Sequence, residues 1–195
     1  MTNRIKAALI AILLLAPVGC GGLRYSQVAP EAKDFHPQGL AILPADTTAF
    51  PEAKGSIDRI FAEVLRDRRW FVRIVGGEEI DRRMENDEEL RRAVTEYRAK
   101  VKNLSFSDPN LSARIGTLTG SDALLLVRVD YWNYTTEKDD KMGKVGISIT
   151  MNEAKTGKTI WSAGHYRASE YVLIKPDLPD VARSLVREMI DHMPH

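Results

Sequence analysis

Few side chains in this sequence have types and spacings suited to chemistry. His192 and His195 are three residues apart near the C-terminus, where they could share a metal ion with Asp191. Chain ends fray, and the helix dipole alone favours a histidine at a helix C-terminus, so we expect no metal site there. His165 could be imagined as a general base with Asp130 on another strand, but a structural histidine is the better explanation. No catalytic residue is therefore predicted.

The motifs and the charge balance exclude several classes of protein. The sequence contains no GxSxG, P-loop, HExxH or dinucleotide-binding fingerprint. Its 28 Lys and Arg residues against 27 Asp and Glu give a formal net charge of +1, whereas nucleic-acid binding needs a basic surface. We expect a protein that is not an enzyme, requires no cofactor and binds no nucleic acid.

Cys20 is the only cysteine of the chain, so its position must explain it. Arg4 and Lys6 precede an apolar run over residues 7–16, which is the order of a secretory signal peptide. That run has about 10 residues, and a membrane-spanning helix needs roughly 20. The pattern predicts a signal peptide that ends immediately before Cys20.

The junction resembles the lipobox, in which a small residue, here Gly19, precedes a cysteine that receives a diacylglycerol thioether. Pro17 stands where the lipobox usually has Leu, Val or Ile. The resemblance implies that residues 1–19 are removed and that acyl chains such as palmitate hold Cys20 in the membrane. Gly21, which is not Asp, favours the outer membrane by the sorting rule of enteric bacteria. An uncleaved anchor and an ordinary secreted protein are the alternatives.

The rest of the chain is predicted to be one domain on a short tether. Residues 20–38 contain glycines, prolines and mixed polar residues, which are typical of a flexible linker. Residues 39–193 show alternating strand and helix periodicities. Strands are expected at 39–44, 70–75, 123–131, 145–151 and 159–173, and helices at 53–68, 78–104, 108–120 and 176–192. This order predicts an α+β fold with a mixed, mainly antiparallel sheet of about five strands and helices mainly on one face.

Aromatic residues on the predicted sheet are candidates for partner binding. Along residues 123–134 the alternate positions ending at Tyr131 are apolar, so the intervening positions should point away from the core. If this strand neighbours residues 159–172, large aromatic side chains share the face that the helices leave open. Such residues are common interface anchors, although packing in the core would also explain them. The predicted binding residues are Trp132, Tyr134, Trp161 and His165.

Three segments carry a resemblance to a family of envelope lipoproteins: residues 40–44 (LAILP), 120–126 (GSDALLL) and 155–161 (KTGKTIW). Together they resemble the superfamily that contains the curli-secretion lipoprotein CsgG, the synthase activator LpoB and the N-terminal domain of TolB, and also small lipoproteins of unknown function. The resemblance implies non-enzymatic proteins that activate peptidoglycan synthases, build secretion channels or scaffold envelope assemblies.

The expected function combines the tether with this resemblance. We expect a non-catalytic lipoprotein in the cell envelope, facing the periplasm from the inner leaflet of the outer membrane. It would act as an interaction, activator or assembly module, bound to an envelope protein or to further copies of itself. The alternative is an envelope hydrolase or a carrier of a small ligand, which a deep pocket with convergent ionisable groups would favour.

Overall fold

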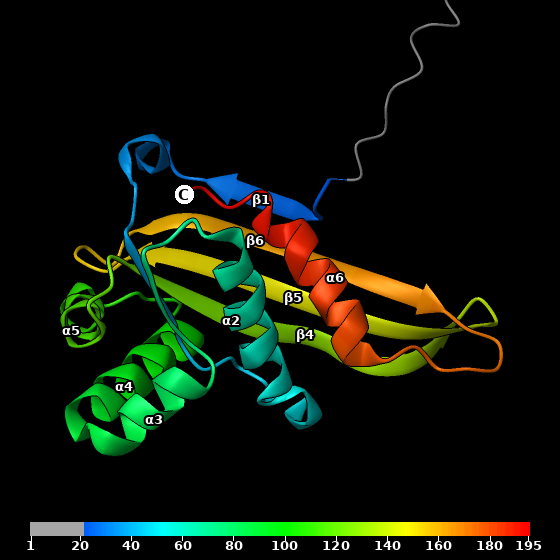
Figure 1. The fold of residues 1–195 in the computed structure, drawn as a ribbon. Helices are drawn as coiled ribbons and strands as arrows, with labels where there is room; N and C mark the ends of the chain where they lie inside the picture. Colours follow the sequence, from blue (N-terminus) through cyan, green and yellow to red (C-terminus); the bar gives the residue numbers. More distant parts are fainter. Residues whose placement is uncertain (1–21) are drawn as a thin grey trace, which may run out of the picture.

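The computed structural model describes residues 22–195, so the predictions for residues 1–19 and Cys20 lie outside the described residues. One mixed sheet of six strands runs through the molecule in the order β1-β6-β5-β4-β2-β3 (Figure 1). The strands are β1 (Tyr25–Val28), β2 (Gly39–Ile42), β3 (Arg73–Val75), β4 (Ala123–Glu137), β5 (Asp140–Glu153) and β6 (Thr159–Glu170). β2 is parallel to β3 and β4, and the remaining pairs are antiparallel.

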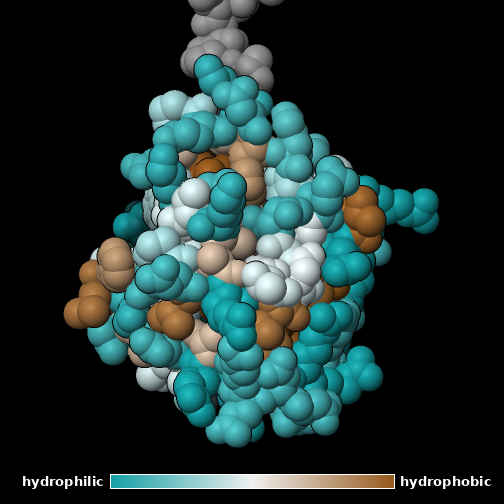
Figure 2. Space-filling model, turned by 90° about the vertical axis from the view of Figure 1, so that its left-hand side faces the viewer, coloured by the Kyte–Doolittle hydropathy of each residue, from teal (hydrophilic) through white to brown (hydrophobic). Residues whose placement is uncertain are grey.

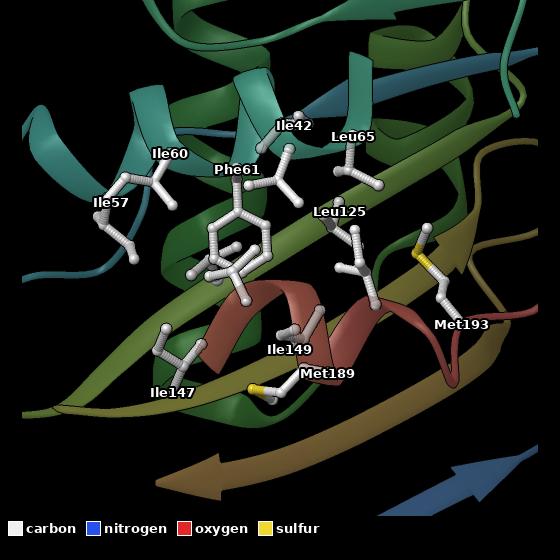
Figure 3. Close-up of a cluster of buried hydrophobic side chains, with 14 of the residues drawn as sticks. Ile42, Ile57, Ile60, Phe61, Leu65, Leu125, Ile147, Ile149, Met189 and Met193 are labelled. Atoms are coloured by element: carbon white, nitrogen blue, oxygen red, sulfur yellow. The ribbon is translucent and has the colours of Figure 1, made fainter. Parts of the chain in front are cut away.

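Two helices cover one face of this sheet. They are α2 (Ser56–Arg68) and α6 (Leu178–Ile190), which lie side by side across the strands (Figure 1). Figure 3 shows Phe61 and Leu65 of α2 and Met189 of α6 pointing toward Leu125 and Ile149 of the strands. The apolar stripe of each helix is thus buried against alternate strand residues, and this layer is the main core.

Three further helices cover part of the opposite face. They are α3 (Glu78–Asn86), α4 (Glu88–Leu104) and α5 (Pro109–Thr119). Their buried residues, among them Val94 and Tyr97, pack on Ala41, Val75 and Leu124 of β2, β3 and β4. Those three strands pair in parallel and are apolar on both faces, as buried parallel strands usually are. The helices are therefore divided between the two faces, whereas the sequence predicts them mainly on one, and α3 to α5 cover only the parallel end of the second face.

Local capping explains where these helices begin. Asp108 accepts hydrogen bonds from the backbone N–H groups of Asn110 and Leu111 at 2.9 and 3.2 Å, so α5 starts at Pro109 as the sequence predicts. Asp87 accepts one from the N–H of Leu90 at 3.0 Å and starts α4 in the same way. This second cap divides the single helix expected over 78–104 into α3 and α4.

Asp122 joins the two strands that the topology brings together from distant parts of the chain. Its carboxylate accepts hydrogen bonds from the backbone N–H groups of Gln38 and Gly39 at 2.9 and 3.0 Å. Gly39 begins β2 and Ala123 begins β4, so this one side chain fixes both strand starts at the same sheet edge. Asp122 therefore holds the turn that enters β2.

The fold class predicted from the sequence, α+β with a mixed and mainly antiparallel sheet, is confirmed with six strands where about five were expected. The additional strand comes from the segment 20–38, which was expected to be a flexible linker. Residues 25–28 pair with β6 as β1, and residues 30–34 form the short 3-10 helix η1. Another 3-10 helix, η2 (Pro51–Ala53), precedes α2.

Candidate interaction face

The antiparallel half of the second sheet face carries no helix in the described part of the chain. We call it the open face; it comprises the outward residues of β1, β6, β5 and the second half of β4. The outward residues of β5 here are Gly146, Ser148 and Thr150, while its alternate residues enter the core. A strand surface of small and polar residues offers little apolar area for a helix to bury, so α3 to α5 stop short of it.

A β-bulge in β4 decides which aromatic residues reach the open face. The register shifts between Val129 and Tyr131, so Asp130 is the extra residue and the alternation of side chains reverses after it. Tyr131 consequently lies on the open face and is 37% exposed, whereas Trp132 enters the core and is only 4% exposed. The predicted outward placement of Trp132 is therefore wrong, because regular alternation along the strand does not include this bulge.

Two tyrosines and a lysine form the centre of the open face. The Nζ atom of Lys144 lies 4.7 Å from the ring centre of Tyr131 and 4.9 Å from that of Tyr166. The two rings meet edge to face, with their centres 6.5 Å apart. Lys144 also donates a hydrogen bond to Glu137 at 2.7 Å, and this bond raises the pKa of Lys144 above its ordinary value. The lysine cation is held against the faces of two aromatic rings.

Two glycines allow the tyrosines to lie flat on the sheet. Tyr131 is paired with Gly146 across the strands, and Tyr25 of β1 is paired with Gly164 of β6. A methyl group added to either glycine would overlap the ring of its tyrosine. The rings of Tyr131 and Tyr25 thus rest directly on the backbone of the neighbouring strand, and both tyrosines remain partly exposed to solvent.

Charged and hydroxyl groups continue the open face toward α4. Arg128 donates to Asp130 at 2.8 Å, and the hydroxyl of Ser148 donates to the other oxygen of Asp130 at 2.5 Å. The hydrogen bond to Asp130 raises the pKa of Arg128. At the wall formed by α4, Lys102 donates to Asp46 at 3.1 Å. These groups are already paired with one another, which suits a surface for recognition more than a site with a free acid or base.

Two hollows follow this surface and share Tyr25, Arg128 and Ser148 in their lining. One, of about 420 Å³, lies between α4 and the sheet and is also lined by Arg98. The other, of about 470 Å³, lies among the tyrosines and includes Tyr166. Together they form one shallow trough along the open face. Its polar groups are spread along the trough and do not converge on one point, unlike those of a typical active site.

The other predicted binding residues lie elsewhere. Trp161 is fully buried on the α2 and α6 face, and its indole N–H donates to the hydroxyl of Ser26 in β1 at 3.0 Å. Tyr134 lies near the tip of β4, where its hydroxyl donates to the carbonyl of Pro176 before α6 at 2.8 Å. The strands β4 and β6 that carry these residues are not neighbours, because β5 lies between them. Trp132, Tyr134, Trp161 and His165 all lie on the side of the sheet that α2 and α6 cover, so they do not form the predicted surface on the face without helices.

The histidines have structural partners. The Nε2 atom of His165 lies 3.6 Å from Glu188 of α6, and its Nδ1 accepts a hydrogen bond from the backbone N–H of Arg24 at 3.1 Å. No hydrogen bond or ion pair within residues 22–195 joins it to Asp130. His195 stacks on Trp70 with ring centres 3.9 Å apart. Asp191, which the sequence offered as a third metal ligand, pairs with Arg68.

The sequence contains a feature that indicates the open-face residues absent from the predicted set. Tyr25, Tyr131, Lys144 and Tyr166 form the open face, yet none was among the candidates. Glycines within strands often mark a close approach by another group, and Gly146 and Gly164 stand opposite two of these tyrosines.

Across the described residues, no cluster of three or more His, Cys, Asp or Glu side chains could hold a metal ion. No helix in this part of the chain is both long and apolar enough to cross a bilayer.

Comparison with known proteins places the fold. No protein-family model and no curated protein sequence matches the chain. The PelC dodecamer from Paraburkholderia phytofirmans aligns with a TM-score of 0.55 and 19% identity over 88% of this chain and 98% of PelC. A variant of the same dodecamer gives a TM-score of 0.51 and 19% identity over 80% and 88%. Lipoprotein GNA1162 from Neisseria meningitidis gives 0.44 and 11% over 78% and 97%.

The likeness to PelC establishes that this chain has the same fold as a protein that was solved as a dodecamer. Membership of the superfamily of CsgG, LpoB and TolB stays a prediction.

Proposed function

We propose that this protein is a non-catalytic lipoprotein of the cell envelope, tethered through Cys20 and assembled with further copies of itself through the open face. The observation that carries the proposal is the group of exposed tyrosines around Lys144, held rigidly on a helix-free sheet surface. Tyrosine supplies a large contact area at a small entropic cost, and rigid aromatic residues dominate many interfaces.

The fold likeness supports self-assembly over a different partner. PelC, which shares the fold, forms a dodecamer. An assembly of many identical copies requires each chain to expose an extended surface to a neighbour. The open face is such a surface, and the trough along it would be filled by side chains of the adjacent copy. The acyl chains on Cys20 would hold all copies on one membrane, facing the periplasm from the outer membrane.

The tether is tested by labelling in living cells. The full-length protein, produced in a Gram-negative host with a clickable palmitate analogue, should carry the label, and the Cys20→Ser variant should not, because Cys20 provides the only thiol. Equal labelling of both proteins would remove the lipoprotein assignment.

The assembly is tested on the same full-length protein after extraction in a mild detergent. Native mass spectrometry should detect an oligomer of the wild type. A variant with Tyr131→Ala and Tyr166→Ala should dissociate at concentrations at least about 30-fold higher, because truncating an interface anchor costs about 2 kcal/mol or more. Arg187→Ala, at an exposed position on α6, is the matched control and should leave the oligomer unchanged. A wild type that is monomeric throughout would contradict the proposal.

A further inference from the structure

The connection between β6 and α6 exposes a run of three large aliphatic side chains. Val172 is 78% exposed, Leu173 is 92% exposed and Ile174 is 86% exposed. No other three consecutive large hydrophobic residues within residues 22–195 are exposed in this way. We call this run the apolar tip. It lies at the end of the sheet beside the turn between β4 and β5 (Figure 1). Water is an unfavourable environment for such a cluster.

The apolar tip is supported by contacts that fix its base. The ring of Tyr171 meets that of Tyr134 edge to face at 6.0 Å, and the backbone N–H of Tyr171 donates to the carbonyl of Lys141 at 2.9 Å. On the other side, the Nζ atom of Lys175 lies 4.7 Å from the ring centre of Tyr134. The aliphatic side chains lie at the tip, and the tyrosines and lysines lie behind them. Membrane-associated proteins place the same residue types in this order, with aliphatic residues in the hydrocarbon and tyrosines and lysines at the headgroups.

The chain leads from this end of the sheet to Cys20. β1 is antiparallel to β6, with Tyr25 opposite Gly164, so the chain before Tyr25 heads toward the end where β6 meets the apolar tip. The hydrogen bond from Arg24 to His165 continues that direction by one residue. Four residues lie between Cys20 and Tyr25, and the five Cα–Cα steps that join them can span about 17 Å, while the seven steps from Gly164 to Tyr171 cover about 23 Å. The peptide alone falls about 6 Å short of the level of Tyr171, and an acyl chain on Cys20 can cover this gap as it enters the bilayer that the apolar tip would meet.

We propose that the apolar tip inserts into the interface of the bilayer that holds Cys20 and acts as a second, non-covalent anchor. The proposal rests on the proposed lipid tether for the identity of the membrane. Two attachment points would fix the orientation of the domain, with the sheet end that carries Tyr171 at the membrane. The end of the molecule seen in Figure 2, which is opposite the apolar tip, shows hydrophobic residues only as small separate spots among hydrophilic ones.

The charged residues around the apolar tip determine whether it needs anionic lipids. Lys138, Lys141 and Lys175 are accompanied by Asp139 and Asp140 in the neighbouring turn. This mixture gives no strong attraction to anionic headgroups, so the aliphatic side chains must provide the driving force. We therefore expect insertion into zwitterionic phosphatidylcholine vesicles, with little dependence on salt concentration.

The test places one fluorescent dye on the lipidated full-length protein. In that protein the sulfur of Cys20 is a thioether, so Leu173→Cys introduces the only reactive thiol, which can be labelled with the dye NBD. In phosphatidylcholine vesicles, its emission should shift to the blue and be quenched by phosphatidylcholine that carries a doxyl group on the acyl chain. Lys155→Cys is the matched control, because residue 155 is exposed in the turn between β5 and β6 at the opposite end of the sheet.

Each outcome is decisive. Quenching at position 173 but not at 155 supports the proposal, and absence of a blue shift at 173 overturns it. A blue shift without doxyl quenching also overturns it, because the dye would then be buried against protein. Labelling of the protein without either substitution would show a free Cys20 and refute the tether alone. Membrane insertion of the apolar tip would then be tested in the Cys20→Ser protein. There, Leu173→Asp should lower the affinity for vesicles about tenfold, and Lys155→Asp should not.

Discussion

Replacing two adjacent aromatic residues of β4 should have opposite consequences, because the bulge at Asp130 turns one into the core and the other to solvent. Trp132→Ala removes a side chain that is 4% exposed and packs in the core under α2 and α6. A buried tryptophan removes about 200 Å² from water, or about 5 kcal/mol at 25 cal/mol per Å². Since alanine keeps part of that burial, the free energy of unfolding should fall by about 3–5 kcal/mol.

Tyr131→Ala should change stability far less. Tyr131 is 37% exposed, and its contacts are the cation of Lys144 and the edge of Tyr166 at the surface. Such exposed contacts contribute about 1 kcal/mol or less. The variant should instead weaken self-assembly, because it removes part of the open face.

The assay for both variants is urea denaturation of the full-length protein in detergent, with unfolding monitored by tryptophan fluorescence and circular dichroism. The protein concentration is one at which the wild type is monomeric. The bulge and the side-chain alternation derived from it would be refuted by two results together: a denaturation midpoint near the wild-type value for Trp132→Ala, and a large loss of stability for Tyr131→Ala. Trp161→Phe is a useful reference, since it shortens a second core tryptophan and removes its hydrogen bond to Ser26.

Three further predictions concern the sheet, its edges and pH. Asp122→Ala should lower the free energy of unfolding by about 1–3 kcal/mol, measured by urea denaturation, because two backbone N–H groups at the start of β2 lose their acceptor. Gly164→Val should displace the ring of Tyr25 and detach β1, which amide hydrogen exchange in residues 25–28 would detect as faster exchange. Lys100 lowers the pKa of Asp108, so the stability from this pair is present above about pH 4 and lost as pH falls through the lowered pKa. Asp108→Asn keeps the helix cap, so its difference in melting temperature from the wild type should disappear in acid.

The sequence predicts most elements of this fold because their periodicities are strong and their caps are local. α5 begins at Pro109 after the cap Asp108, as expected from those two residues alone. The division of α3 from α4 at Asp87 was missed because the charged helical pattern continues through it. Residues 25–28 carry no alternation that predicts a strand, and they become β1 only because the edge of β6 is available to them.

The candidate site was harder to predict because it depends on one inserted residue. Up to Val129 the alternation in β4 is correct, and Asp130 then shifts Tyr131 outward and Trp132 inward. Nothing in the local sequence requires a bulge there, since it arises from the pairing with β5. Val172 and Leu173 of the apolar tip lie within the predicted strand 159–173 because their residue types favour strands, although β6 ends at Glu170.

Site-specific photo-crosslinking in intact cells tests the central claim most directly. A photoreactive phenylalanine analogue placed at Tyr166 on the open face should crosslink one copy of the full-length protein to another and give a ladder of multiples of its mass. The same analogue at Arg187, which is exposed on the helical face, should give monomer only. Monomer at both positions, or equal ladders from both, would contradict assembly through the open face.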